Sequence, residues 1–161
     1  MRVKELMSQP VRFCEVTDTA DKAAQIMWEA DCGVVPVVDG DRHVVGMITD
    51  RDICMTALFH GTALQDIPIS EVMSSEVYAC GPDDELSEAE RLMSARQVHR
   101  LPVLATDGTP IGMLSVADLV REARPGTAKH AAGDSTEECV RTIAAISQPR
   151  AVLQATGRRT H

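Results

Sequence analysis

The chain has 161 residues, with 24 acidic and 16 basic side chains and a formal net charge of −8. This acidic balance is the opposite of the basic surface that binds DNA or RNA, so nucleic acid is disfavoured as a partner. No apolar run is long enough to span a bilayer, and the first residues form no signal-peptide core. We therefore expect a cytoplasmic protein with no membrane partner.

An internal repeat organises most of the sequence. A constant shift of 66 residues aligns positions 3–53 with 69–119 without a gap, and fourteen of the fifty-one aligned pairs are identical. Self-similarity at a fixed spacing is the signature of a repeat architecture. We expect a first repeat at 1–62, a second at 63–124, and a C-terminal connector, short helix and flexible tail at 125–161.

Both repeats predict the order strand, helix, strand, strand, helix, which is an α/β (α+β) fold of two βαββα units. Apolar residues at helical spacing follow Asp18 and Asp84, which we expect to cap the first helix of each repeat. Pro36 is expected at an exposed strand start or edge, since proline cannot donate to a sheet. The first repeat should contain a helical or turn-like lead at 3–7, strands at 11–16, 34–38 and 43–48, and a last helix starting at Thr49.

A further short helix is expected near the C-terminus. Ser135 and Glu138 have the spacing of a capping box, and apolar residues recur at helical spacing from Val140 to Ile146 before Pro149 ends the pattern. We expect this amphipathic helix to dock on a repeat or on a second subunit.

A Gly-x-x-Thr/Ser-x-x-Asp motif occurs once in each repeat, where a strand is expected to lead into a helix. Thr49 precedes Asp52 by three positions, and Ser115 precedes Asp118 by the same interval. The spacing fits a capping box that closes the helix start. It also fits a nucleotide site, because a helix N-terminus attracts phosphate and a nearby acid can accept ribose hydroxyls. The duplication favours the second interpretation.

These residues resemble a known family. The strands Val35–Val37 and Leu101–Val103 read Val-Pro-Val and Leu-Pro-Val, and the leads Glu5–Ser8 and Glu71–Ser74 read Glu-Leu-Met-Ser and Glu-Val-Met-Ser. Together with the duplicated motif, they resemble the CBS domain, and the tandem is similar to a stand-alone bacterial CBS pair, or Bateman module. The resemblance covers residues 3–124 and implies two repeats packed around a pseudo-twofold axis with two clefts between them.

The resemblance implies that the clefts bind adenine nucleotides such as AMP, ADP or ATP, and in some members NAD or S-adenosylmethionine. Asp52 and Asp118 match the acid that holds ribose, and Thr49 and Ser115 match the hydroxyl residue near phosphate. The other cleft residues that the resemblance implies are Val11, Val34, Val35, Val77, His99, Arg100 and Leu101.

The two expected clefts differ in their cations. Arg100 aligns with Val34, and Arg51 aligns with Ala117. Either arginine could reach phosphate or lie in solvent, and the sequence leaves both alternatives open. We expect the clefts to bind with unequal affinity.

The sequence predicts a regulatory protein rather than an enzyme. No nucleophile has a base and an orienting acid at motif spacing, and the histidines and cysteines lack metal-ligand spacing. We expect an adenine nucleotide as regulatory ligand, a homodimer, and a protein effector that reads a conformational change. Two alternatives are a structural dimerisation module with vestigial clefts and a thiol-based stress sensor that uses Cys14, Cys54 or Cys80.

Overall fold

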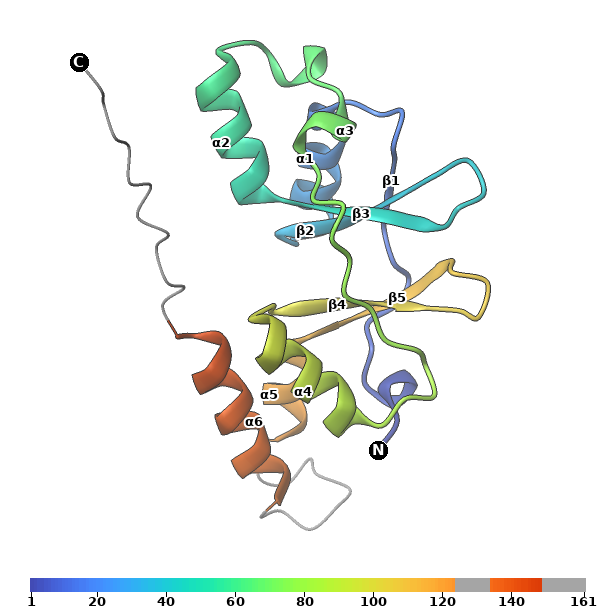
Figure 1. The fold of residues 1–161 in the computed structure, drawn as a ribbon, viewed down its shortest axis with the longest axis vertical. Coiled ribbons are helices and arrows are strands. Elements are labelled where there is room, and N and C mark those ends of the chain that lie inside the picture. Colours follow the sequence, from blue (N-terminus) through green and yellow to red (C-terminus); the bar gives the residue numbers. More distant parts are fainter. Residues whose placement is uncertain (124–133, 149–161) are drawn as a thin grey trace, which may run out of the picture.

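The computed structural model describes residues 1–123 and 134–148 and contains two similar units, the first above the second in Figure 1. The mixed α/β fold with a tandem repeat is confirmed. The elements up to residue 60 are η1 (Val3–Glu5), β1 (Cys14–Glu15), α1 (Ala20–Glu29), β2 (Val34–Val38), β3 (Val44–Thr49) and α2 (Asp50–His60). The remaining elements are η2 (Leu64–Asp66), α3 (Ile69–Val72), α4 (Leu86–Arg96), β4 (Arg100–Leu104), β5 (Pro110–Ser115), α5 (Val116–Glu122) and α6 (Asp134–Ile146).

The two sheets have the same register. In the first, β1 runs parallel to β2, and β2 pairs antiparallel with β3 so that Val35 faces Ile48. In the second, β4 pairs antiparallel with β5 so that Leu101 faces Leu114, and Cys80 makes a parallel bridge to Val103 in the place of β1. Alternate residues of each central strand point into a separate hydrophobic core.

The prediction for Pro36 was wrong. β2 is the central strand of its sheet, and Pro36 is fully buried. The proline is tolerated because β1 pairs with β2 only at Val37 and Val38, so no strand on that side needs an amide from position 36.

The predicted caps Asp18 and Asp84 were also wrong, because the N-caps are Thr19 and Glu85, one residue later. Asp18 closes the preceding turn instead: the Glu15 amide donates to its carboxylate at 2.8 Å. Asp84 accepts from the Gly81 amide at 2.7 Å in the same way.

The segments before each repeat cross to the other repeat. Val3 lies in the core of the second repeat, whereas Ile67, Ile69 and Val72 lie in the core of the first. Backbone hydrogen bonds fix both crossings: Ser8 and Met113 exchange a pair at 2.8 and 3.1 Å, and Ser74 and Met47 exchange a pair at 2.8 and 2.9 Å. Each repeat therefore completes its core with chain that precedes its partner.

The crossings explain the glycine of the duplicated motif. A Cβ atom on Gly46 would lie 2.6 Å from the sulfur of Met73, and one on Gly112 would lie 2.7 Å from the sulfur of Met7. Glycine leaves the space in which the crossing segment passes over β3 or β5. The glycine therefore serves packing. Because it has no side chain, the segment that follows Ser8 or Ser74 can lie beside the motif.

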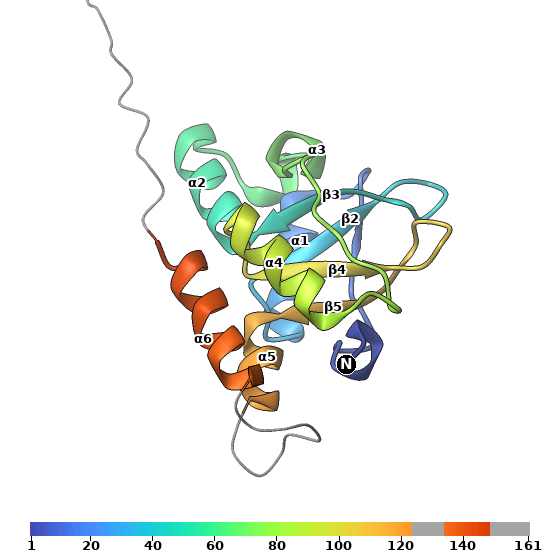
Figure 2. The ribbon, with the colours of Figure 1, turned by 60° about the horizontal axis from the view of Figure 1, so that its bottom comes forward.

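Helix α6 covers the second repeat. It packs along α4 and also contacts α5, as Figure 2 shows. Cys139, Thr142 and Ile146 are buried on its inner side. Of the two docking surfaces expected for this helix, the structure uses a repeat of its own chain. The expected side-chain pair of Ser135 and Glu138, and the expected stop at Pro149 with the tail after it, lie outside the described residues.

Candidate functional site

Both duplicated motifs form capping boxes at helix starts. The Thr49 amide and hydroxyl donate to Oδ2 of Asp52 at 2.9 and 2.6 Å, and the Asp52 amide donates to the Thr49 hydroxyl at 3.1 Å. The Ser115 amide and hydroxyl donate to Oδ2 of Asp118 at 2.8 and 2.5 Å. The local geometry predicted from the sequence is confirmed in both repeats.

The remaining carboxylate oxygens differ sharply between the repeats. Oδ1 of Asp118 accepts from the Ser8 hydroxyl at 3.3 Å and pairs with the Arg121 guanidinium. Asp118 is only 3% exposed. Asp52 is half-buried, and among residues 1–123 and 134–148 no hydrogen bond reaches its Oδ1. The first-repeat carboxylate thus keeps an acceptor for a ligand, whereas both oxygens of Asp118 are engaged within the protein.

One aligned position accounts for much of this difference. Arg121 corresponds to Met55 in the first repeat. A guanidinium at i+3 from Asp118 can pair with its carboxylate on the helix surface, and a thioether at i+3 from Asp52 cannot. Ser74, the counterpart of Ser8, accepts a bond from the Glu76 amide at 3.4 Å.

The strands place the expected lining residues beside these helix starts. Val34 pairs with Thr49 across β2 and β3, and Arg100 pairs with Ser115 across β4 and β5. Val34 is half-buried and Arg100 is exposed. Val35 and Leu101, the next residues, are fully buried and point into the cores, so only their backbones can face a cleft.

The other expected residues lie at the rim or on the crossing segments. Arg51 is exposed in the first turn of α2, and His99 is exposed before β4. Val11 and Val77 are half-buried. Because the segments cross, Val11 comes three residues after Ser8, which donates to Asp118 of the second repeat. Val77 comes three residues after Ser74, which bridges to β3 of the first repeat.

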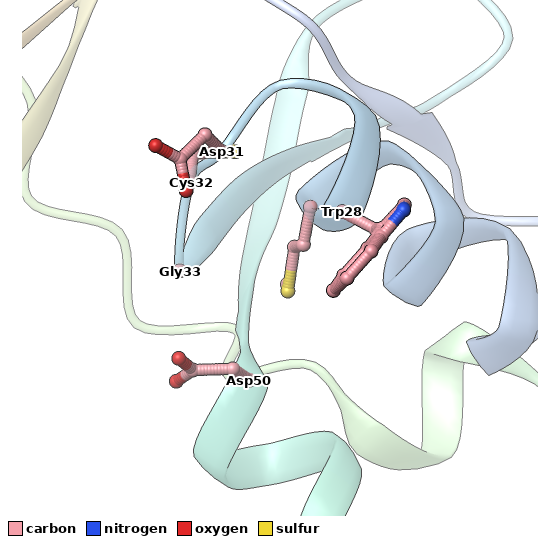
Figure 3. A pocket seen from close by; sticks show the side chains of 6 residues that line it. Trp28, Asp31, Cys32, Gly33 and Asp50 are labelled. Carbon is pink, nitrogen blue, oxygen red and sulfur yellow. The ribbon is translucent and has the colours of Figure 1, made fainter.

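A cavity of about 480 Å³ lies close to the first-repeat motif. It is lined by Met27, Trp28, Asp31, Cys32, Gly33 and Asp50. Figure 3 shows Trp28 on α1 and Asp50 at the start of α2 on opposite sides of this space. Gly33 and Asp50 are the chain neighbours of Val34 and Thr49, and the Asp50 amide donates to the Gly33 carbonyl at 3.1 Å. The residue-type patterns did not point to this cavity, and none of the expected site residues lines it.

The cysteines expected for a redox sensor lie in two environments. Cys14 and Cys80 are buried, and burial raises the pKa of each thiol to about 12. Because the thiolate is the reactive form, both side chains are poor candidates for fast oxidation at neutral pH. Cys54 is exposed on α2.

Within the described residues, no three or more histidine, cysteine, aspartate or glutamate side chains gather as a candidate metal site. Across the same residues, no helix combines the length and apolarity needed to cross a membrane.

Comparisons with known proteins match this architecture. The chain is 34% identical over 117 residues to the CBS domain-containing protein YhcV of Bacillus subtilis, covering 73% of this chain and 81% of that protein. The crystal structure of the CBS domain pair of protein MJ0100 with 5′-methylthioadenosine and S-adenosyl-L-methionine superposes with a TM-score of 0.67 at 25% identity, covering 75% and 94% of the two chains.

The crystal structure of Hypoxic Response Protein I with two coordinated zinc ions gives a TM-score of 0.68 at 28% identity, covering 75% of this chain and 98% of that one. The family model of the CBS domain matches twice, at residues 3–57 and 69–124. The chain therefore belongs to the CBS domain family and is a tandem pair of CBS domains.

Proposed function

We propose that this chain is a non-catalytic regulatory module that binds an adenosine-containing ligand in the cleft of the first repeat. Candidate ligands are AMP, ADP and ATP, followed by NAD and S-adenosylmethionine. The structure of the related MJ0100 pair contains 5′-methylthioadenosine and S-adenosyl-L-methionine, which share the adenosine group.

One observation carries the proposal: the open Oδ1 of Asp52, beside the Thr49 hydroxyl at the start of an eleven-residue helix. A ribose hydroxyl can donate to this oxygen while Oδ2 holds the helix start. The phosphate end of the ligand then lies near the first turn of α2, where the positive end of the helix dipole favours negative charge. Arg51, in the same turn, can approach a phosphate from the exposed side.

The second cleft is expected to bind more weakly. A ligand there must displace Ser8 or Arg121 from Asp118, and it loses the hydrogen bonds that those groups already make. Arg100 at the rim offers a cation in partial compensation. We propose that the first cleft fills at lower ligand concentration, and that filling it changes the angle between the repeats or between dimer subunits, which a protein effector reads.

Calorimetric titration with AMP, ADP, ATP, NAD and S-adenosylmethionine tests this assignment, with GTP as a control for the base. Asp52→Asn removes one carboxylate acceptor and should weaken binding by about 10-fold or more, since a hydrogen bond to a charged group is worth roughly 1.5–3 kcal/mol. Asp118→Asn is the matched control and should leave the high-affinity site intact. Equal loss in both variants, or loss only in Asp118→Asn, would contradict the assignment.

The structural dimerisation module remains the second candidate. Its clefts would bind none of the five ligands at millimolar concentration. The thiol-sensor alternative rests on Cys54, because Cys14 and Cys80 are buried.

A further inference from the structure

A second cavity lies between α4 and α6, the helix that covers the second repeat. Its volume of about 820 Å³ is within the range of roughly 300–1,000 Å³ that small-molecule sites occupy. The side chain of Gln97, just after α4, donates to the carbonyl of Gln148, just after α6, at 3.5 Å. The two helices therefore run in the same direction, as Figures 1 and 2 show. The residues six positions earlier, Arg91 and Thr142, consequently lie at about the same height.

Two polar side chains lie deep in this cavity. Thr142 on α6 is 3% exposed, and Glu90 on α4 is 6% exposed. The Glu90 carboxylate lies near α6, since its charge adds to burial in raising the pKa of the Cys139 thiol. Within residues 1–123 and 134–148, no hydrogen bond reaches the Thr142 hydroxyl. A buried hydroxyl is normally hydrogen-bonded, so this one lines the cavity with a group that a ligand can satisfy.

The mouth of the cavity carries charges of both signs. Arg91 on α4 pairs with Glu88 at 3.6 Å, and Arg141 on α6 pairs with Glu137 at 2.5 Å. Both pairs are exposed, so each holds its arginine weakly, and either guanidinium can turn toward an anion at little cost. The cavity therefore combines a buried carboxylate with two adjustable cations at its mouth.

This mixture of charges selects among ligand classes. Glu90 and Glu137 would repel a dicarboxylate or a phosphate ester, and Arg91 and Arg141 would repel a polyamine. A zwitterion meets an opposite charge at each end. Its ammonium can donate to the deep Glu90 carboxylate, while its carboxylate accepts from a guanidinium at the mouth and from the Thr142 hydroxyl. Because Arg91 follows Glu90 directly along the chain, the two ligand charges must be close together, as they are in an α-amino acid.

Small residues leave room for a ligand side chain about one turn further along the helices. Ser94 and Ala95 on α4 and Ala145 on α6 line this part of the cavity. In the first repeat, the residue aligned with Ser94 is Trp28, and an indole at position 94 would fill the space. The two alanine methyl groups favour a small or aliphatic side chain on the ligand.

We propose that the cavity between α4 and α6 binds a free α-amino acid with a small or aliphatic side chain. Its ammonium lies beside Glu90, and its carboxylate lies among Arg91, Arg141 and Thr142. Since the ligand contacts both helices, its binding holds α6 against the second repeat. This inference goes beyond the proposed adenosine site and does not depend on it.

Thermal unfolding of the full chain with glycine, alanine, serine, valine or leucine tests the proposal. An amino acid that binds should raise Tm by roughly 3–8 °C at ten times its Kd. N-acetylalanine lacks the ammonium group, and alaninamide lacks the carboxylate, so neither should raise Tm. Putrescine, which carries only positive charge, should also have no effect.

Two cavity variants and a matched control locate the site. Thr142→Val keeps the shape of the side chain and removes the hydroxyl. It should not lower Tm without ligand, because the hydroxyl has no partner to lose, but it should weaken amino-acid binding about 10-fold in calorimetry. Ser94→Trp, which installs the residue of the aligned position 28, should abolish binding by filling the cavity. Val140→Thr makes the reverse change at a 59% exposed position of α6 and should leave binding unchanged. Circular dichroism verifies that the variants remain folded.

Several results would overturn the proposal. They are no rise in Tm with any of the five amino acids, an equal rise with N-acetylalanine or alaninamide, and binding that both cavity variants retain. A rise in Tm that saturating AMP abolishes would also overturn it, because the amino acid would then occupy the adenosine cleft. Binding of AMP by a protein that binds no amino acid would leave the proposed function standing, and the reverse result would leave only this inference standing.

Discussion

Removing the two motif aspartates should have unequal effects on folding stability. Asp52→Ala and Asp118→Ala both lose the hydrogen bonds from the preceding hydroxyl residue and its amide, so this shared part cancels in the comparison. Asp118→Ala additionally loses the contacts of Oδ1 with Ser8 and Arg121. It also empties a site that is 3% exposed, whereas Asp52 is half-buried.

The size of the difference follows from these extra contacts. The Ser8 hydrogen bond is long at 3.3 Å and is worth about 1 kcal/mol at most. The Arg121 side chain is 63% exposed, so solvent screening limits its pair with Asp118 to roughly 0.5–1 kcal/mol. We expect Asp118→Ala to lower the free energy of unfolding by about 1–2 kcal/mol more than Asp52→Ala, or by roughly 2–8 °C in Tm.

Urea denaturation followed by circular dichroism measures both variants on the same scale, provided that the slope of the transition is unchanged. Arg121→Met installs the residue of the aligned position 55 and removes the ion pair with Asp118. It should therefore reproduce the part of the destabilisation that is due to this ion pair. Equal destabilisation by the two alanine variants, or a larger effect of Asp52→Ala, would refute the assignment of Asp118 as the internally bonded carboxylate.

Two further predictions concern packing and thiol chemistry. Gly46→Ala should destabilise the fold by about 1–3 kcal/mol, because its Cβ would lie 2.6 Å from a methionine sulfur. The control in urea denaturation is Gly40→Ala, whose Cβ meets nothing within 4 Å. Equal destabilisation by the two variants would refute the packing role of Gly46. Iodoacetamide at pH 8 should modify Cys54 first and spare Cys14 and Cys80 until urea unfolds the chain, as mass spectrometry of the peptides would show. Burial raises the pKa of both thiols from 9.0 to about 12, so their contribution to stability should be complete below pH 9 and lost as the pH rises toward 12. A double variant with Cys14→Ala and Cys80→Ala that loses as much stability as wild type over this pH range would contradict this prediction.

Local chemistry made part of this structure predictable. The hydroxyl and the acid at an interval of three specify a capping box wherever a helix starts, so Thr49 with Asp52 and Ser115 with Asp118 were predicted correctly. The repeat fixed the strand order in the same way. Asp18 misled because an aspartate can close a turn as well as cap a helix, and both uses place it before the same apolar pattern.

Long-range contacts were beyond the reach of these patterns. Nothing local to Val3 shows that it enters the core of the second repeat, and nothing local to Asp118 shows that Ser8, 110 residues earlier, donates to it. Pairing each residue with its counterpart at an interval of 66 does reveal the differences that matter, since Trp28 against Ser94 and Met55 against Arg121 are visible in the sequence. Interpreting these differences required the positions of α6 and Asp118 in the structure.

The ligand roles of the motif residues remain predictions, and two-dimensional NMR of the isotope-labelled chain tests them most directly. Titration with AMP, or with whichever adenosine ligand binds most tightly, should first shift the amides of Val34 and of Thr49 to Asp52. The amides of Ser115 to Asp118 should follow only at higher concentration. Shifts that begin at Ser115 to Asp118, or spectra unchanged by every adenosine ligand, would contradict binding at the first-repeat helix start.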